Sequence, residues 1–219
     1  MASADILTID RLLDHVSTAP AIAGESVQLF VREKAGASIA HAAPGEVSAE
    51  KILLIVHGGY WPCVNGADLQ YRDYSWMEAL ASAGYDVFAM DMTGYGFSSR
   101  PLMDNPANFP PEYQDLLIPR TLDAHLPPTH PVKLVTSDSE SDDIDRVVNF
   151  ICELRGVDKI NLLGWSGGGI RTGTYTVRHQ EKVGKLIIFA SSNYDRSNPD
   201  HPPAILPEPT LPMRIRSPT

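Results

Sequence analysis

The sequence predicts an α/β protein with a mostly parallel sheet that is flanked by helices. Short apolar runs alternate along the chain with stretches of helical periodicity, which is typical of parallel α/β sheets. Several of these runs are continuously apolar, as in strands that are buried on both faces. Glycine-rich turns follow three of them, after Val56, Met90 and Leu163. Because ligands of such sheets bind at the carboxyl ends of the strands, we expect the three turns to converge on one site.

The composition indicates one globular domain that spans residues 1–219. The chain is 43% hydrophobic and 21% charged, as in ordinary globular proteins. Its formal net charge of −9 disfavours nucleic acid and anionic membranes as partners, because both bind basic surfaces. The sequence shows neither a signal peptide nor an apolar run long enough to cross a bilayer. We therefore expect a cytoplasmic protein in which Cys63 and Cys152 are reduced thiols.

The first half of the chain contains three predicted strands. Residues 1–20 carry only a weak pattern. Helical spacing of Trp76, Leu80 and Ala83 precedes a plausible stop at Gly84. In chain order the predicted elements are a strand at residues 26–31, a loop at 35–50, a strand at 51–57, a helix at 71–85 and a strand at 86–91.

The second half begins with a proline-rich segment at residues 92–141, which we interpret as a functional loop because long structureless segments are uncommon inside domains. A helix is predicted next, with Ser141 as its N-cap and three aspartates in its first turn. This acidic run lacks the glycine and the terminal glutamate of a calcium-binding loop. The remaining predictions are a helix at 142–155, a strand at 159–164, a helix at 167–183, a strand at 185–190 and a proline-rich tail at 191–219.

A G-x-S-x-G sequence at residues 164–168 is the strongest functional signal. An apolar run precedes it and a helical stretch follows, which is the context of a nucleophile elbow, a sharp turn that exposes a serine. Glycines flank such a turn because its backbone is strained and closely packed. The pattern predicts that Ser166 is a nucleophile that attacks a carbonyl carbon. The alternative is a tight turn with a packing role only.

The sequence His57-Gly58-Gly59-Tyr60-Trp61 follows the central strand. Acyl transfer builds negative charge on the carbonyl oxygen, and each fixed N–H donor that meets this charge is worth about 3 kcal/mol. We expect Gly167 to supply one such N–H, and Gly59 or Tyr60 to supply the other. The alternative is a turn without substrate contact. His57 itself is expected to fix the loop by hydrogen bonds rather than to act as the base.

A third motif, Asp-x-x-Gly-x-Gly-x-Ser, occupies residues 91–98. It lacks the G-x-G-x-x-G spacing of a dinucleotide site, so we expect it to shape the loop beside the active site. Together, the three motifs resemble those of the α/β-hydrolase superfamily over roughly residues 25–195. The resemblance is strongest to its esterase and epoxide-hydrolase-like branch, and the His-Gly-Gly-x-Trp loop is similar to that of some formamidases and carboxylesterases. Serine at position 166 argues against epoxide hydrolase and dehalogenase activity, because those members carry aspartate there.

The resemblance implies a hydrolase with a Ser–acid–His triad, an acyl-enzyme intermediate and no cofactor. In this family the acid follows a later strand and the histidine follows the last one. Residues 185–190 look like the sixth of eight strands, so the fold is expected to be C-terminally incomplete, with the tail as a candidate start of a lid. Asp195 matches the position of the acid in some branches. The histidine would come from a missing part or from a second chain, with His201 as a local alternative.

Two functions therefore stay open at this point. The first is a serine hydrolase that acts on a small carboxylic ester or related acyl compound. The second is a non-catalytic binding protein that keeps the hydrolase fold without its triad. We expect no metal site, because His125 and His130 lie among prolines with few thiols or carboxylates nearby.

Overall fold

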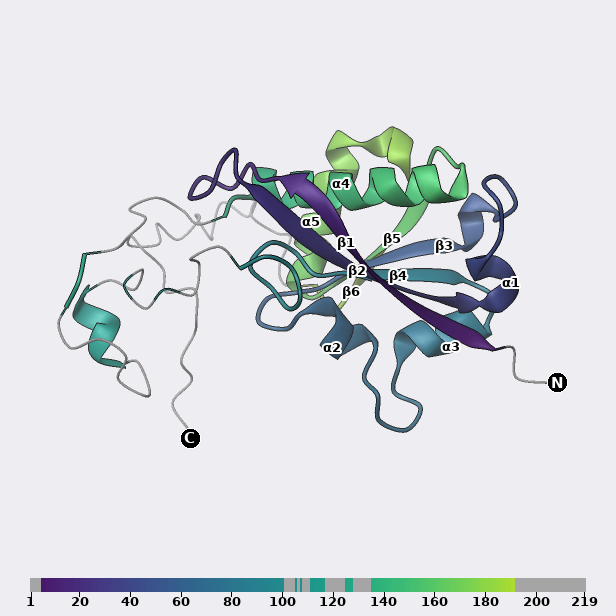
Figure 1. Ribbon diagram of the computed structural model, residues 1–219, viewed down its shortest axis with the longest axis horizontal. Coiled ribbons are helices and arrows are strands. Elements are labelled where there is room, and N and C mark those ends of the chain that lie inside the picture. The colour runs from purple at the N-terminus through teal and green to yellow at the C-terminus, as the bar shows by residue number, and fades with distance from the viewer. Residues whose placement is uncertain are drawn as a thin grey trace, which may run out of the picture.

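The computed structural model describes residues 5–100, 105, 107, 111–116, 125–127 and 135–191. Within this part of the chain, six strands form one sheet in the order β1-β2-β4-β3-β5-β6 (Figure 1). Strands β4, β3, β5 and β6 are parallel, whereas β1 and β2 form an antiparallel hairpin at one edge. The mostly parallel sheet that the sequence predicts is therefore confirmed. The strands are β1 (Ile6–Val16), β2 (Ser26–Gly36), β3 (Ile52–Val56), β4 (Asp86–Met90), β5 (Ile160–Trp165) and β6 (Val183–Phe189).

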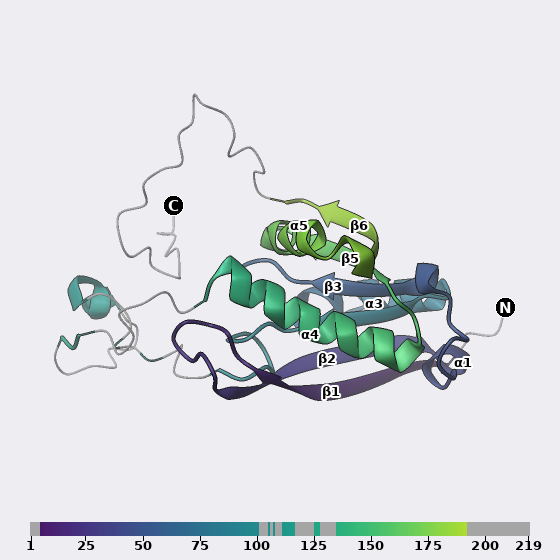
Figure 2. The same ribbon diagram turned by 90° about the horizontal axis from the view of Figure 1, so that it is seen from above.

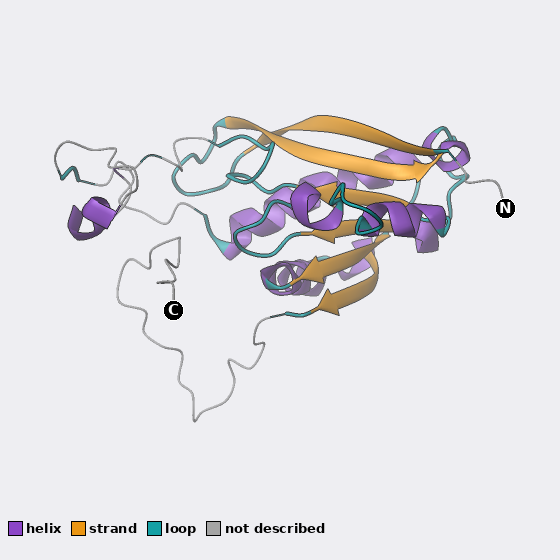
Figure 3. Ribbon diagram, turned by 90° about the horizontal axis from the view of Figure 1, so that it is seen from below, coloured by secondary structure: helices purple, strands orange, loops and turns teal. Residues whose placement is uncertain are grey.

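Helices cover both faces of the sheet. The two longest, α4 (Ser137–Arg155) and α5 (Gly167–Arg178), pack on one face, as Figure 2 shows from above. Two shorter helices, α2 (Cys63–Ala67) and α3 (Trp76–Ser82), pack on the other face, which Figure 3 shows from below. The remaining short elements are α1 (Ala37–Ala40) and the 3-10 turns η1 (Ala49–Lys51), η3 (Pro111–Leu116) and η4 (Gln180–Lys182).

The core lies on both sides of the central strands. Every residue of β3 and β4 is buried. Because successive side chains of a strand point to opposite faces, Leu54 and Phe88 pack under α4, whereas Leu53 and Val87 pack against α2 and α3. This two-sided burial explains why both strands are continuously apolar in sequence.

The N-terminal hairpin differs from the sequence prediction. Residues 1–20 carry only a weak pattern, yet β1 pairs with β2 along its whole length, from Ile6 with Gly36 to Val16 with Ser26. Strand β2 also extends five residues beyond the predicted end at residue 31. Most of the side chains of β1 are exposed or half-buried, because it is an edge strand. Its apolar signal is weak for this reason.

Three helix boundaries also differ. The helix predicted at residues 71–85 is the shorter α3, and α2 lies unpredicted before it. Helix α4 begins at Ser137 rather than at residue 142, and Thr136 rather than Ser141 caps it, through a reciprocal capping box with Ser139. The helix after Ser166 ends at Arg178, five residues before the predicted end at 183. Most of the proline-rich segment and all of the tail from residue 192 lie outside the described residues.

Strand β6 lies at the edge of the described sheet. Ile187, Ile188 and Phe189 are 44–49% exposed, so the strand leaves apolar surface uncovered within the described part of the chain. None of the described helices is both long and apolar enough to cross a membrane.

Candidate active site

Ser166 occupies the strained turn between β5 and α5. Its backbone has φ 54° and ψ −123°, in the positive-φ region that residues with a side chain rarely adopt. The turn is held at both ends. The Ser166 N–H donates to the carbonyl of Phe189 at the end of β6 (2.9 Å), and its carbonyl accepts from the Gly169 N–H (3.0 Å). The strand-to-helix turn that the sequence predicts for an elbow is thus present.

Glycines are required on both sides of the elbow because other backbone atoms lie against them. A Cβ on Gly164 would overlap the Thr172 hydroxyl and the Gly168 carbonyl. A Cβ on Gly168 would overlap the carbonyl of Val56 and lie 2.7 Å from that of His57. The absence of these side chains lets α5 start directly against the ends of β3 and β5.

The loop after β3 lies on the elbow. A Cβ on Gly58 would sit 2.9 Å from the Cβ of Ser166 and 3.2 Å from the nitrogen of Gly167. The nitrogen of Gly59 lies 3.3 Å from the point that a Cβ on Gly167 would occupy. No other described residue accepts a hydrogen bond from the N–H of Gly59, Tyr60 or Gly167. These three N–H groups, which the sequence predicts as oxyanion donors, therefore lie near Ser166 or on the adjacent loop, and no acceptor in the described part of the chain binds them.

His57 is buried between two loops. Its Nε2 accepts from the Met92 N–H (3.2 Å), so its proton is on Nδ1, which donates to the Gly58 carbonyl (2.6 Å). Burial, reinforced by the charge of Arg171, lowers the pKa of His57 to about 3. The ring is therefore neutral at pH 7, with both nitrogens engaged. These contacts agree with the loop-fixing role that the sequence predicts.

Sequence reasoning missed Arg171, on α5. One of its terminal nitrogens, Nη1, donates to the carbonyls of His57 (3.0 Å) and Gly58 (2.8 Å). Its other nitrogens bind Glu140 of α4 at 2.7–2.9 Å. Burial opposes its charge, but the Glu140 carboxylate keeps the pKa of Arg171 above its ordinary value. The only signal in the sequence is an arginine five residues after Ser166.

The third motif is a structural loop, as predicted. The buried Asp91 carboxylate accepts from the N–H groups of Cys63 (2.7 Å) and Phe97 (3.0 Å), and burial raises the pKa of Asp91. The Ser98 hydroxyl donates to the Asp91 carbonyl and accepts from the Phe30 N–H of β2. This loop therefore ties the start of α2 and strand β2 to the end of β4.

The other predicted triad members, Asp195 and the alternative base His201, lie outside the described residues. The histidine that follows Ser166 within the described chain is His179. It stacks on Tyr175 at the far end of α5, which a regular helix of this length places about 18 Å from the elbow. Among the residues that the structure describes, none hydrogen-bonds the Ser166 hydroxyl, and no cluster of potential metal ligands is found.

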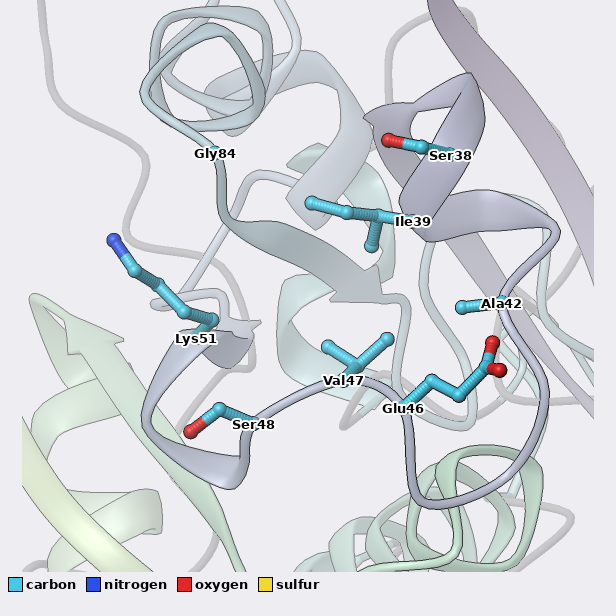
Figure 4. A pocket seen from close by; sticks show the side chains of 8 residues that line it. All are labelled: Ser38, Ile39, Ala42, Glu46, Val47, Ser48, Lys51 and Gly84. Atoms are coloured by element: carbon cyan, nitrogen blue, oxygen red, sulfur yellow. The ribbon is translucent and has the colours of Figure 1, made fainter.

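Two hollows lie away from Ser166. One, of about 340 Å³, is at the amino ends of β3 and β4, and Figure 4 shows Ile39 and Val47 on facing sides of it. The other, of about 510 Å³, is an apolar groove between α5 and β6 that includes Val177 and Ile188. Neither touches the elbow, so neither is the candidate active site.

Residues 51–214 match the family model of the alpha/beta hydrolase fold. Together with the sheet order and the elbow, this match shows that the chain belongs to the alpha/beta hydrolase family.

Three known proteins are similar to parts of this chain. A 58-residue segment is 40% identical to the poly(3-hydroxyalkanoate) polymerase subunit PhaC of Allochromatium vinosum, covering 26% of this chain and 16% of that protein. A probable hydrolytic enzyme from Pseudomonas aeruginosa PAO1 aligns with a TM-score of 0.52 and 17% identity, over 84% of this chain and 41% of that one. A hypothetical protein from Pseudomonas aeruginosa aligns with a TM-score of 0.51 and 12% identity, over 90% of this chain and 46% of that one. The chain thus spans less than half the length of each, and the two structural likenesses show the fold alone.

Proposed function

We propose that this chain carries the nucleophile and the oxyanion hole of a serine hydrolase that acts on a small carboxylic ester or related acyl compound. The observation that carries the proposal is the strained backbone of Ser166, with the unused N–H groups of Gly59 and Gly167 beside it. A serine is placed in such a turn to expose its hydroxyl. The family match supports hydrolase chemistry. The partial likeness to a polymerase of a polyester supports an ester substrate.

In the proposed reaction the Ser166 hydroxyl oxygen attacks the acyl carbon, and a base takes its proton. The negative charge on the carbonyl oxygen is stabilised by the N–H of Gly167 and by that of Gly59 or Tyr60. The tetrahedral intermediate expels the alcohol, which takes the proton from the base, and leaves an acyl group on Ser166. The base then takes a proton from water, which attacks this ester, and the carboxylic acid leaves as the serine hydroxyl regains its proton. The base is a histidine outside the described residues, oriented by an acid for which Asp195 is our candidate. The reaction uses no cofactor.

The test is covalent labelling of the full chain with a fluorophosphonate probe. We expect the wild type to be labelled and the Ser166→Ala variant to remain unlabelled. Ser38→Ala is the matched control, because this serine lies at the other end of the sheet, beside the 340 Å³ hollow, and its loss should not change labelling. A folded wild type that stays unlabelled would contradict the proposal and favour a non-catalytic binding protein.

A further inference from the structure

Arg171 links the start of α5 to the loop that faces Ser166. Its Nη1 donates to two successive carbonyls of this loop, those of His57 and Gly58. The side chain is only 12% exposed, and Glu140 pairs with it on the opposite side. The guanidinium also lies 5.5 Å from the centre of the Tyr95 ring. An arginine that is buried and paired in this way has one orientation, because breaking either set of contacts would leave polar groups unsatisfied.

The carbonyl that Arg171 holds determines where the next N–H points. The carbonyl oxygen of Gly58 accepts from both Arg171 and the His57 Nδ1. In a trans peptide the C=O and N–H point in opposite directions. The N–H of Gly59 therefore points away from Arg171. The Gly59 nitrogen itself lies 3.3 Å from the point that a Cβ on Gly167 would occupy, directly after Ser166.

Packing constrains only one side of this peptide, because a Cβ on Gly58 would meet Ser166 and Gly167, whereas the space beside the Cα of Gly59 is open. A Cβ on Gly59 would meet no atom within 4 Å, and glycines on both sides of the peptide permit most backbone conformations. If the peptide rotated, the Gly58 carbonyl would replace the Gly59 N–H beside Ser166. A carbonyl dipole there would repel the oxyanion that the N–H stabilises.

We propose that Arg171 is a positioning residue that sets the oxyanion hole by holding the Gly58–Gly59 peptide with its N–H toward Ser166. This inference rests on the proposed function. The sequence left Gly59 and Tyr60 open as the second oxyanion donor. The inference selects Gly59, because its N–H belongs to the peptide that Arg171 holds. Glu140 holds Arg171, and His57 is the second donor to the same carbonyl.

The experiment compares hydrolysis of an ester with that of its thionoester by the full chain. Sulfur accepts hydrogen bonds weakly, so a working oxyanion hole favours the oxygen ester. In Arg171→Ala, kcat for the ester should fall about 10²–10³-fold, as for loss of one oxyanion donor, while KM changes little. The rate for the thionoester should fall much less. The ratio of the ester rate to the thionoester rate should therefore be much lower in Arg171→Ala than in the wild type. Arg171→Lys should recover most of the ratio, because one nitrogen makes both carbonyl contacts.

Arg178→Ala is the matched control, because this arginine lies on the same helix in an exposed pair with Asp138, and its loss should leave both rates unchanged. An equal loss for both substrates in Arg171→Ala would overturn the proposal and show a merely structural role. Crystal structures of the wild type and Arg171→Ala add a readout that needs no activity. If the wild type neither labels nor hydrolyses, the proposed function fails. An unchanged Gly58 carbonyl in the variant crystal would overturn the role of Arg171 as well.

Discussion

At the scale of single residues, the environment rather than the residue type determines what a histidine does. His57 precedes the loop that lies on the elbow, but both nitrogens of its buried ring already make hydrogen bonds, to Gly58 and Met92. A base in the proposed reaction must take the proton of the Ser166 hydroxyl, and the neutral ring of His57 has no free nitrogen to accept it. The same burial makes His57 a sensor of acid, because protonation would put a second donor against the Met92 N–H.

We therefore predict that His57 lowers stability in acid. Its pKa is about 3 when folded and about 6.5 when unfolded, so the unfolded chain binds a proton that the folded chain excludes. The free energy of unfolding should fall as the pH drops from 6.5 toward 3, by up to ~1.4 kcal/mol per pH unit. Urea unfolding of wild type and His57→Gln at several pH values measures this.

The His57→Gln variant is needed as a reference because Asp86 changes the free energy of unfolding in the opposite direction as the pH falls. Burial raises the pKa of Asp86 from 3.8 to about 6, so its protonation favours the folded chain as the pH falls through that range. The difference in slope between wild type and His57→Gln isolates the histidine. Parallel slopes would contradict the prediction.

The sequence predicts the role of a residue where that role depends on residues next to it in the chain. Ser166 and its flanking glycines share one turn, so their pattern is local. Arg171 and the Gly58 carbonyl are 113 residues apart, and an arginine within a helix resembles any solvated one. Its role needed the three-dimensional contact.

At the scale of elements, the site depends on how closely β5 and α5 approach. The helix starts one residue after the serine, and the Thr172 hydroxyl, which donates to the Gly168 carbonyl (2.9 Å), faces Gly164 of the strand. This contact and the hydrogen bond from the Ser166 N–H to the Phe189 carbonyl hold the two ends of the turn in which Ser166 has its positive φ. Packing between neighbouring elements therefore holds the strained backbone of Ser166 in place.

We predict that Gly164→Ala destabilises the chain by about 1–3 kcal/mol, the usual cost of overpacking a core. The added methyl group meets backbone atoms of Gly168, which move only if the start of α5 moves. Gly36→Ala is the control, because a methyl group there meets no atom within 4 Å. Chemical denaturation of both variants measures the difference, and equal stabilities would show that the strand and helix separate easily.

Element types followed from periodicity where both faces of a strand are buried, as in β3 and β4. The sequence did not predict β1, because an exposed edge strand carries no strong apolar pattern. The predicted start of α4 was also wrong. There, Ser139 and Thr136 cap each other, whereas the aspartates that follow suggested a later start. Local side-chain competition thus decided the boundary.

At the scale of the whole molecule, the candidate site and a buried ion cluster lie at opposite ends of the sheet. The carboxyl end carries the strained elbow and the loop that faces it. The amino end carries a buried ion cluster in which Arg155 of α4 binds Glu33 of β2 (2.5 Å) and Asp86 of β4 (2.6 Å), and Arg11 of β1 also binds Glu33 (2.6 Å). The cluster joins four elements from distant parts of the chain. Its two positive and two negative groups balance.

We predict that Arg155→Ala destabilises the chain by about 3–5 kcal/mol, because removing one partner of a buried ion pair leaves the other charge uncompensated. Glu33 and Asp86 are fully buried, and Arg155 is 1% exposed. Arg178→Ala, which removes an exposed pair with Asp138, should cost less than about 1 kcal/mol. Urea unfolding of the two variants compares them directly. Equal costs would mean that water reaches the cluster and solvates the carboxylates once the guanidinium is gone.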